Sequence, residues 1–325
     1  MKRTVLAILL GLVLLAARAQ DASQAFLALK LPVSAHVGAL GGENVSLVED
    51  APWAGWSNPS LYAGVSDKSL GLTYMSYASS SSWLGAQYVM AFGERHTAAF
   101  AAQYMGYGSM DETDEAGNVL GQFSPKDIVF SGAYSYLLSD AWAGGASLKL
   151  ITSNYGHYKA LALAVDLGIN YLDEEKDFSL GLTLRNVGAQ LKSFDGHTER
   201  VPFNLQVGFT KGMNHLPVRI SVTMTDLTRW KQSDYALSDG EKVSFGKRLL
   251  NHFVVGLDIL PTESIYLSVG YNFRRAYELK AAGSGHGAGI TAGAGLNLKK
   301  FKFGATYARY HKSTSALMFN AGYSF

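Results

Sequence analysis

The 325-residue sequence contains no cysteine, so disulfide bonds and thiolate metal sites are excluded. Charged residues make up 17% of the chain, which is below the ~25% of an ordinary soluble domain. After residue 19 there is no apolar run of about 18 residues or more, which excludes a bundle of membrane-spanning helices. The basic residues form no dense patch, so nucleic acid is not an expected partner.

The N-terminus has the features of a secretory signal peptide. A basic start, Lys2-Arg3, precedes an apolar run that extends to Ala17, and Ala17-Arg18-Ala19 fits the small-x-small cleavage pattern. A membrane-anchor helix is the alternative, but the run is short for crossing a bilayer. We therefore expect residues 1–19 to be a signal peptide. Its removal takes away three basic side chains and leaves 25 basic and 26 acidic ones, a net charge of −1.

Aromatic residues and glycine are abundant, and apolar side chains recur at every second position. The clearest case is the segment "LALAVDLGINYL" at 161–172, and segments 201–210 and 286–298 repeat the pattern. Alternation of this kind gives a strand one apolar face and one small or polar face. Fourteen strands are expected, at 70–77, 83–92, 97–105, 127–138, 142–153, 160–171, 179–188, 201–210, 217–226, 252–260, 264–273, 286–298, 301–310 and 315–325.

The connections between these strands sort by length. Those after even-numbered strands are short, whereas several after odd-numbered strands are long, namely 106–126, 189–200, 227–251 and 274–285. Short periplasmic turns and long extracellular loops are typical of outer-membrane barrels. The sequence therefore predicts an all-β fold, a 14-stranded transmembrane outer-membrane β-barrel over residues 70–325. With an even strand count, both termini are expected on the periplasmic side.

The last strand has the expected apolar face and ends on an aromatic residue. Phe319, Tyr323 and Phe325 lie on this face and are interpreted as the barrel assembly signal. We expect the last strand to pair with the first, so that no edge is left open. Phe325 is then expected in the aromatic belt at the periplasmic boundary.

Residues 20–69 do not alternate and are expected to form an N-terminal plug or hatch segment inside the barrel. A fourteen-stranded barrel is wide enough to have a lumen that such a segment would fill. A mobile periplasmic tail is the alternative. The residues assigned to the plug motif are Gly41, Gly42, Asn44, Asp50, Asn58, Pro59 and Leu61.

Several stretches resemble known families. "SAHVGALGGENVSLVEDAPWAGWSNPSL" resembles the opening motif of FadL-like outer-membrane barrels. "FLALKLPVSAHVGALGGENVSLVED", "GGASLKLITSNYGHYKALALAVDLGINY" and "RNVGAQLKSF" resemble the PorQ family of the type IX secretion system of Bacteroidota, and this resemblance runs from about residue 25 to the C-terminus.

The resemblance to the PorQ family implies a non-enzymatic outer-membrane component of the attachment complex. Such a protein is expected to anchor a PorZ-like surface protein and to act beside PorU-like and PorV-like proteins. This complex processes cargo and joins it to anionic lipopolysaccharide. The alternative function is that of a FadL-type passive transporter of hydrophobic solutes, because the two groups share the plugged barrel.

No catalytic, cofactor or metal motif is found, so an enzyme is not expected. Ser244 and Lys247 match a Ser-x-x-Lys pattern, but the partner motifs of that class are missing and the pair falls in a long loop. Lys149, Asp166 and Arg185 fall on inward faces of the expected strands. They either form a polar conduction path or pack against the plug.

The long loops are the expected docking surfaces for a partner. Residues 227–251 carry Trp230, Tyr235 and Phe245 among several charges, and 106–126 carries the acidic run "MDETDE". Aromatic residues beside arginine are common anchors at protein interfaces. Besides the attachment-complex proteins, membrane lipids are expected partners.

Overall fold

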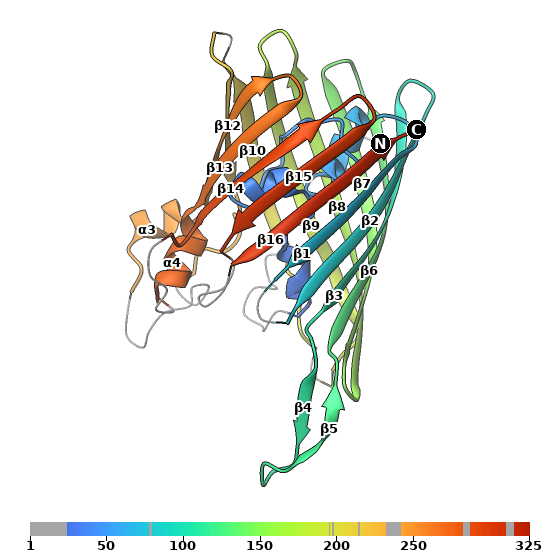
Figure 1. Ribbon diagram of the computed structural model, residues 1–325, viewed down its shortest axis with the longest axis vertical. Coiled ribbons are helices and arrows are strands. Elements are labelled where there is room, and N and C mark those ends of the chain that lie inside the picture. Colours follow the sequence, from blue (N-terminus) through green and yellow to red (C-terminus); the bar gives the residue numbers. More distant parts are fainter. Residues whose placement is uncertain are drawn as a thin grey trace, which may run out of the picture.

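The computed structural model describes residues 25–77, 80–194, 196, 198–213, 215–231, 242–281, 287–309 and 315–325. The expected signal peptide and Tyr235 lie outside these residues. Within them, fourteen antiparallel strands form one closed barrel, as predicted (Figure 1). The barrel strands are β1 (Ser69–Ser76), β2 (Ser82–Phe92), β3 (His96–Gly106), β6 (Lys126–Leu137), β7 (Trp142–Tyr155), β8 (Tyr158–Asp173), β9 (Phe178–Lys192), β10 (Asn204–Gly212), β11 (Val218–Met224), β12 (Phe253–Thr262), β13 (Ile265–Asn272), β14 (Ile290–Asn297), β15 (Phe301–Ala308) and β16 (Ala316–Ser324).

The strands show the alternation that the sequence predicts. In β15, every second side chain is buried and the others are exposed. The outward side chains are mostly leucine, phenylalanine and tyrosine, such as Leu72, Phe100 and Phe303. Because these exposed residues recur around the barrel, they form an apolar outer band of the kind that faces lipid. Most inward side chains are small or polar, and a few large apolar ones such as Trp83, Met75 and Ile151 join them.

The barrel closes by pairing of its first and last strands. β1 and β16 are antiparallel and stay in register from Ser69–Ser324 to Ser76–Leu317. The Ser69 and Ser324 hydroxyls are 2.8 Å apart and form a hydrogen bond. This continuous ladder leaves no open edge at the seam.

The register between β8 and β9 shifts at two places, and the second of them lies in the barrel wall near Asp166. Val165 pairs with Val187, whereas Leu167 pairs with Leu184, so β9 carries an extra residue here. Asn186 has a positive φ of 57°, and its N–H donates to Asp166 Oδ1 at 2.7 Å. Asparagine tolerates this conformation better than most residues, and the extra residue makes a β-bulge that turns polar side chains inward.

Two expected strands begin three or more residues later than predicted. β10 begins at Asn204 instead of 201, because Pro202 has no N–H to contribute to the ladder. β14 begins at Ile290 instead of 286, because Gly287 and Gly289 take positive φ values in a turn.

The long connections contain structure of their own. β4 (Met110–Thr113) and β5 (Val119–Phe123) form a hairpin that projects beyond the barrel (Figure 1). Two short helices, α3 (Phe245–Leu250) and α4 (Phe273–Ala281), follow at the same end. None of the helices described is long and apolar enough to cross a membrane.

Residues 25–65 lie inside the barrel (Figure 1). They form η1 (Leu27–Lys30), α2 (Ala35–Ala39), η2 (Ala54–Trp56) and η3 (Pro59–Gly64). Ala25 N–H donates to the Arg200 carbonyl at 3.0 Å, in the long β9–β10 connection. From there the segment runs to the end with short connections, where β1 begins. We call residues 25–65 the inner segment.

The two ends of the described chain therefore lie at opposite ends of the barrel. Phe325 is at the short-connection end, and its N–H donates to the Lys68 carbonyl at 3.2 Å. Ala25 is at the long-connection end. The periplasmic placement of both termini stays a prediction, as does the role of the inner segment as a plug.

Candidate functional site

The Asn58-Pro59 turn sits on a pair of glycines in the barrel wall. Gly145 of β7 and Gly168 of β8 are directly paired. A Cβ atom at Gly145 would overlap the Pro59 backbone, and one at Gly168 would overlap the Asn58 side chain. The side chain of Asn58 is held by Ser60, whose Oγ donates to Asn58 Oδ1 at 2.7 Å. Glycine is thus required on both strands for the turn to reach the wall.

The Gly41-Gly42 turn makes a similar contact on the other side of the barrel. Both glycines have positive φ values, 102° and 91°. The paired wall residues Gly256 and Gly270 lie beneath this turn and Leu40, and a Cβ atom on either would overlap it. These contacts explain why the motif needs glycine both in the turn and in the wall.

The other residues of the predicted plug motif fix the inner segment locally. Asn44 Oδ1 accepts hydrogen bonds from the N–H groups of Ser46 and Leu47, each at 2.9 Å. Leu61 is buried against the wall. Gly41, Gly42, Asn44, Asn58, Pro59 and Leu61 thus make contacts within the inner segment or between it and the wall.

Asp50 ties the inner segment to the seam of the barrel. Its carboxylate accepts from the Ser66 N–H at 2.8 Å and from Lys302 Nζ at 2.9 Å. Partial burial acts to raise the pKa of Asp50, but the hydrogen bonds from Ser66 and Lys302 outweigh it and hold the pKa below its ordinary value.

The inward charges predicted from the sequence pack together. Lys149 and Asp166 form a fully buried ion pair at 2.5 Å, and Lys149 Nζ lies 4.4 Å from the centre of the Trp56 ring. Arg185 reaches Glu43 of the inner segment at 3.3 Å. Because these charges are paired with one another or with the inner segment, the geometry favours packing over a polar conduction path.

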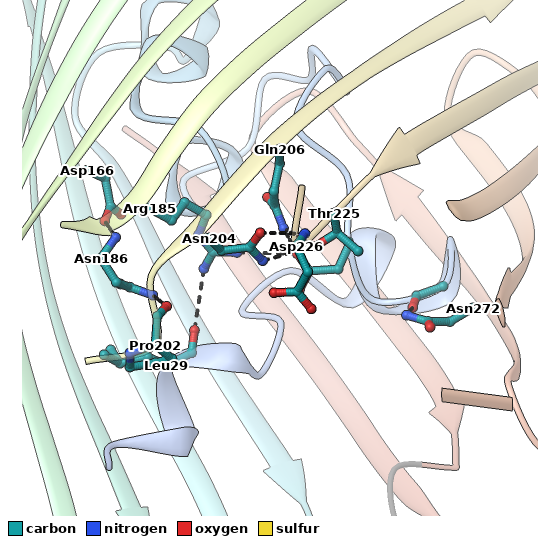
Figure 2. Close-up of polar contacts among 12 residues, drawn as sticks. Leu29, Asp166, Arg185, Asn186, Pro202, Asn204, Gln206, Thr225, Asp226 and Asn272 are labelled. Atoms are coloured by element: carbon teal, nitrogen blue, oxygen red, sulfur yellow. Dashed lines mark hydrogen bonds and ion pairs between the residues drawn. The ribbon is translucent and has the colours of Figure 1, made fainter. Parts of the chain in front are cut away.

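Hydrogen bonds continue this network across the neighbouring strands (Figure 2). Asn186 Nδ2 donates to the Pro202 carbonyl at 3.0 Å. Gln206 Nε2 donates both to Glu43 Oε2 and to Thr225 Oγ1, each at 2.9 Å. Burial raises the pKa of Glu43, although the nearby Arg185 charge opposes this rise.

A second buried network surrounds His36 of α2. Its two ring nitrogens lie 2.8 Å from Glu49 Oε2 and 3.0 Å from Asp258 Oδ1. Its ring stacks on Tyr266 at 3.7 Å between centroids. Asp258 also accepts from Arg219 Nε at 2.9 Å. Burial acts to lower the pKa of His36, but the Glu49 charge and the hydrogen bond to Asp258 outweigh it and raise the pKa.

An apolar pocket of about 620 Å³ opens at the long-connection end. We call it the mouth pocket. The start of the inner segment forms one side, and the ends of β3, β5 and β7 with their connections form the other. The lining side chains include Phe26, Leu27, Leu31, Met105, Tyr107, Phe123, Tyr155 and Phe194. Its volume and its apolar lining match those of sites for small molecules.

Beneath the pocket, a buried carboxylate orders the aromatic side chains. Asp127 accepts from the hydroxyls of Tyr107 at 2.6 Å and Tyr155 at 3.0 Å. The Tyr155 ring stacks on Phe194 with centroids 5.2 Å apart. Burial and the Asp127 charge raise the pKa of Tyr107, which keeps its hydroxyl protonated as a donor.

Phe26 enters the pocket in an unusual backbone conformation. Its φ of 59° and ψ of 41° are left-handed, which costs a non-glycine residue about 1–2 kcal/mol. Its ring is buried and lies 6.4 Å from the Phe194 ring. Sequence reasoning missed this pocket, because its walls come from segments far apart in the chain. The only sequence feature that pointed to the pocket was the presence of aromatic residues, such as Tyr107 and Phe194, in the connections between strands.

The predicted docking loop is only partly described. The Trp230 ring lies 4.0 Å from the His252 ring and 6.4 Å from the exposed Phe245 ring. Tyr235 lies outside the described residues. In the predicted assembly signal, Phe319 faces outward, and the rings of Tyr323 and Phe325 are 4.9 Å apart. Among the described residues, no group of three or more histidine and acidic side chains is placed to hold a metal ion.

Comparison with known proteins gives structural neighbours but no sequence relatives. No protein-family model and no curated protein matches the chain. The toluene transporter TodX of Pseudomonas putida superposes with a TM-score of 0.52 at 13% identity, covering 90% of this chain and 97% of TodX. A FadL homologue of Pseudomonas aeruginosa gives a TM-score of 0.54 at 12% identity, covering 90% and 98%.

The monoaromatic hydrocarbon channel CymD gives a TM-score of 0.54 at 11% identity, covering 91% of this chain and 98% of CymD. At such low identity the likeness shows the fold alone. The fold is that of a FadL-like outer-membrane barrel. TodX is described as a toluene transporter and CymD as a monoaromatic hydrocarbon channel.

Proposed function

We propose that this protein is an outer-membrane channel that takes up small hydrophobic molecules through the mouth pocket. The pocket itself carries this proposal, because it is apolar, of ligand size and placed at the entrance to the barrel. The likeness to channels described as carrying toluene and monoaromatic hydrocarbons supports it at the level of the fold.

The physical basis for capture is removal of apolar surface from water. Burying about 150 Å² of a small aromatic solute contributes about 4 kcal/mol at ~25 cal/mol per Å². This corresponds to a Kd of roughly 1 mM, which is weak enough to allow release. Passage beyond the pocket requires the inner segment to shift, because Leu29, Val33 and Leu40 are buried in the lumen.

The test is to fill the pocket. Leu27 lines the pocket and is exposed. Leu27→Trp therefore places a bulky indole ring in the pocket without disturbing a packed core. Leu191→Trp makes the same change on the exposed part of β9, outside the pocket. Saturable binding of toluene is measured by equilibrium dialysis with the protein in nanodiscs. Leu27→Trp is expected to weaken it at least tenfold, and Leu191→Trp to leave it unchanged. Equal binding by both variants would contradict the channel.

The second candidate is the function implied by the resemblance to the PorQ family, namely an anchor for a PorZ-like surface protein in type IX secretion, together with PorU-like and PorV-like proteins. The β4–β5 hairpin favours it. Val119 and Leu120 of β5 are 62% and 67% exposed, and the hairpin that carries them extends beyond the barrel. Exposed apolar side chains on a projecting hairpin suit a protein partner.

This candidate is tested by purification of the tagged protein from its native host in mild detergent. Residues 111–122 are replaced by a short Gly-Ser turn, which leaves the pocket residue Phe123 in place. The intact protein is expected to recover a PorZ-like partner in stoichiometric amount, and the shortened one to lose it. Recovery of the intact barrel alone, with a hydrophobic ligand, would reject the anchor and support the channel.

A further inference from the structure

The short helix α3 displays apolar and basic side chains together. Phe245 and Leu250 are 65% and 50% exposed, and Leu249 is also exposed. Lys242 and Lys247 are exposed beside them. We call these five residues the α3 patch. Exposure of three large apolar side chains on one short helix is costly in water and indicates a surface that something covers.

The position of the α3 patch continues the lipid-facing band. Leu250 precedes the start of β12 at Phe253 by three positions, and Leu257 and Ile259 of that strand face outward. In Figure 1, α3 lies outside the strands, beside the long-connection end of the barrel. The patch therefore lies beside a strand whose outward side chains belong to the lipid-facing band.

The helix is held in this place by Trp230. Arg248 Nη1 donates to the Trp230 carbonyl at 2.9 Å, and the rings of Trp230 and Phe245 are nearly parallel, at 22°. Trp230 in turn packs on His252 at 4.0 Å. The patch is thus a fixed surface attached to the end of the barrel.

The basic side chains of the patch are suited to an anionic partner. Residues 242–252 carry three basic side chains and no carboxylate. Lys242 and Lys247 form no ion pair with the described part of the chain. The neighbouring helix α4 differs, because its Arg274 is paired with Asp226 and Glu278, each at 2.8 Å. Within the described residues, the two lysines are thus exposed and available to an anionic partner.

We propose that the α3 patch lies in the headgroup layer of the membrane and binds anionic lipid headgroups. Phe245, Leu249 and Leu250 enter the boundary of the acyl chains, and Lys242 and Lys247 bind the headgroup phosphates. Interfacial helices combine an apolar face with basic residues in this way. Each lysine near an anionic lipid surface adds attraction that salt weakens. This proposal is independent of any ligand in the mouth pocket.

The absence of cysteine makes a direct test possible. Leu250→Cys is labelled with an environment-sensitive fluorophore, and Val119→Cys on the hairpin is the control that projects into water. Both proteins are placed in vesicles of phosphatidylcholine, with or without phosphatidylglycerol. The label at 250 is expected to report an apolar environment once phosphatidylglycerol is present, and the label at 119 to stay in water.

The charge requirement is tested with two matched double variants in the same labelled protein. Lys242→Gln with Lys247→Gln is expected to raise about tenfold the amount of phosphatidylglycerol needed for insertion. Lys159→Gln with Lys192→Gln removes the same charge from exposed positions at the same end of the barrel and is expected to have no effect. The variants leave the acidic residues that precede Lys242, Asp239 and Glu241, unchanged, so only the two positive charges are removed.

Two results would overturn the proposal. A label at 250 that stays in water in both kinds of vesicle would leave the patch free for a protein partner. Equal insertion in both lipids, unaffected by the lysines, would show that anionic headgroups are not bound there.

Discussion

Glycine residues of the strands and polar residues of the lumen together hold the inner segment in the barrel. The glycines act by absence of a side chain, since the backbone of the segment occupies the space that a Cβ atom would need. The polar residues act by pairing, as Asp258 and Glu49 do with His36. The first effect depends on the absence of a Cβ atom and the second on individual hydrogen bonds, so each can be tested by one substitution.

The first prediction concerns Gly145. Gly145→Ala is expected to destabilise the protein by about 1–3 kcal/mol, because the new methyl group meets the Pro59 backbone. Hydrogen exchange over residues 25–65 should become faster. Gly132→Ala on the adjacent strand is the control. A Cβ atom at Gly132 would meet only the Phe100 ring within 4 Å, at an ordinary van der Waals distance. Unchanged exchange in Gly145→Ala would contradict the docking contact.

The second prediction concerns pH. The pKa of His36 is raised in the folded protein above its ordinary value of 6.5, so the folded state binds the proton more tightly than the unfolded state. The resulting stabilisation is complete below the ordinary pKa and is lost as pH rises through the folded pKa. The free energy of unfolding should therefore fall by up to about 1.4 kcal/mol per pH unit in that interval.

Urea titrations in detergent at several pH values measure this dependence. His36→Gln is expected to remove it. His157→Gln is the control, because His157 is exposed and lies 3.5 Å from an exposed carboxylate of Glu112. A wild-type profile that is flat above the ordinary histidine pKa would refute the role of His36.

Among the structural elements, the β4–β5 hairpin is separate from the barrel. In the described residues, its two strands pair with each other and with no barrel strand. Its ion pair to His157 is exposed and contributes little to stability. The hairpin is thus an attachment to the barrel that contributes little to its folding.

The third prediction follows from this separation. Replacing residues 111–122 by a short turn is expected to change the free energy of unfolding by less than about 1 kcal/mol. In SDS gel electrophoresis, the unheated shortened protein should also still migrate as a folded barrel. A large loss of stability would show that the hairpin supports the barrel wall.

The elements differ in how far their sequence predicts them. All fourteen barrel strands follow from alternation, because one face of each strand meets an apolar environment and the other does not. The hairpin strands were missed, since most of their side chains on both faces are exposed and no alternation results. Helices α3 and α4 lie in connections that show no strand pattern.

The interior was harder to predict than the wall. The inward direction of Lys149, Asp166 and Arg185 follows from strand period, and the structure confirms it. Which glycine meets which residue of the inner segment depends on strand register and barrel closure, which no local pattern encodes. The mouth pocket was missed for the same reason, since Phe26 and Phe194 are distant in sequence and meet only after closure.

For the molecule as a whole, the fourth prediction concerns Phe325 of the predicted assembly signal. Deleting Phe325 is expected to change the stability of the purified barrel by less than about 1 kcal/mol, because its exposed ring packs on Tyr323 alone among the described aromatic rings. The amount of folded barrel in the outer membrane should instead fall severalfold, as expected of an assembly signal. Phe303→Ala, at an outward position of β15, is the control for loss of an exposed ring. Equal amounts of both variants in the membrane would reject the signal.

The contacts between the inner segment and the seam also lead to an expected order of folding steps. Asn320 of β16 donates to the Val33 carbonyl at 3.1 Å, across 287 positions of the chain. The last strand of the barrel therefore binds a segment that precedes the first strand, and contacts of such long range form slowly. We expect the inner segment to reach the lumen before β1 and β16 complete their ladder, because the contacts with Val33 lie on the inner face of the seam. A barrel closed without the inner segment would then lack the hydrogen bond from Asn320 to Val33 at its seam, so complete closure is expected to accompany filling of the interior.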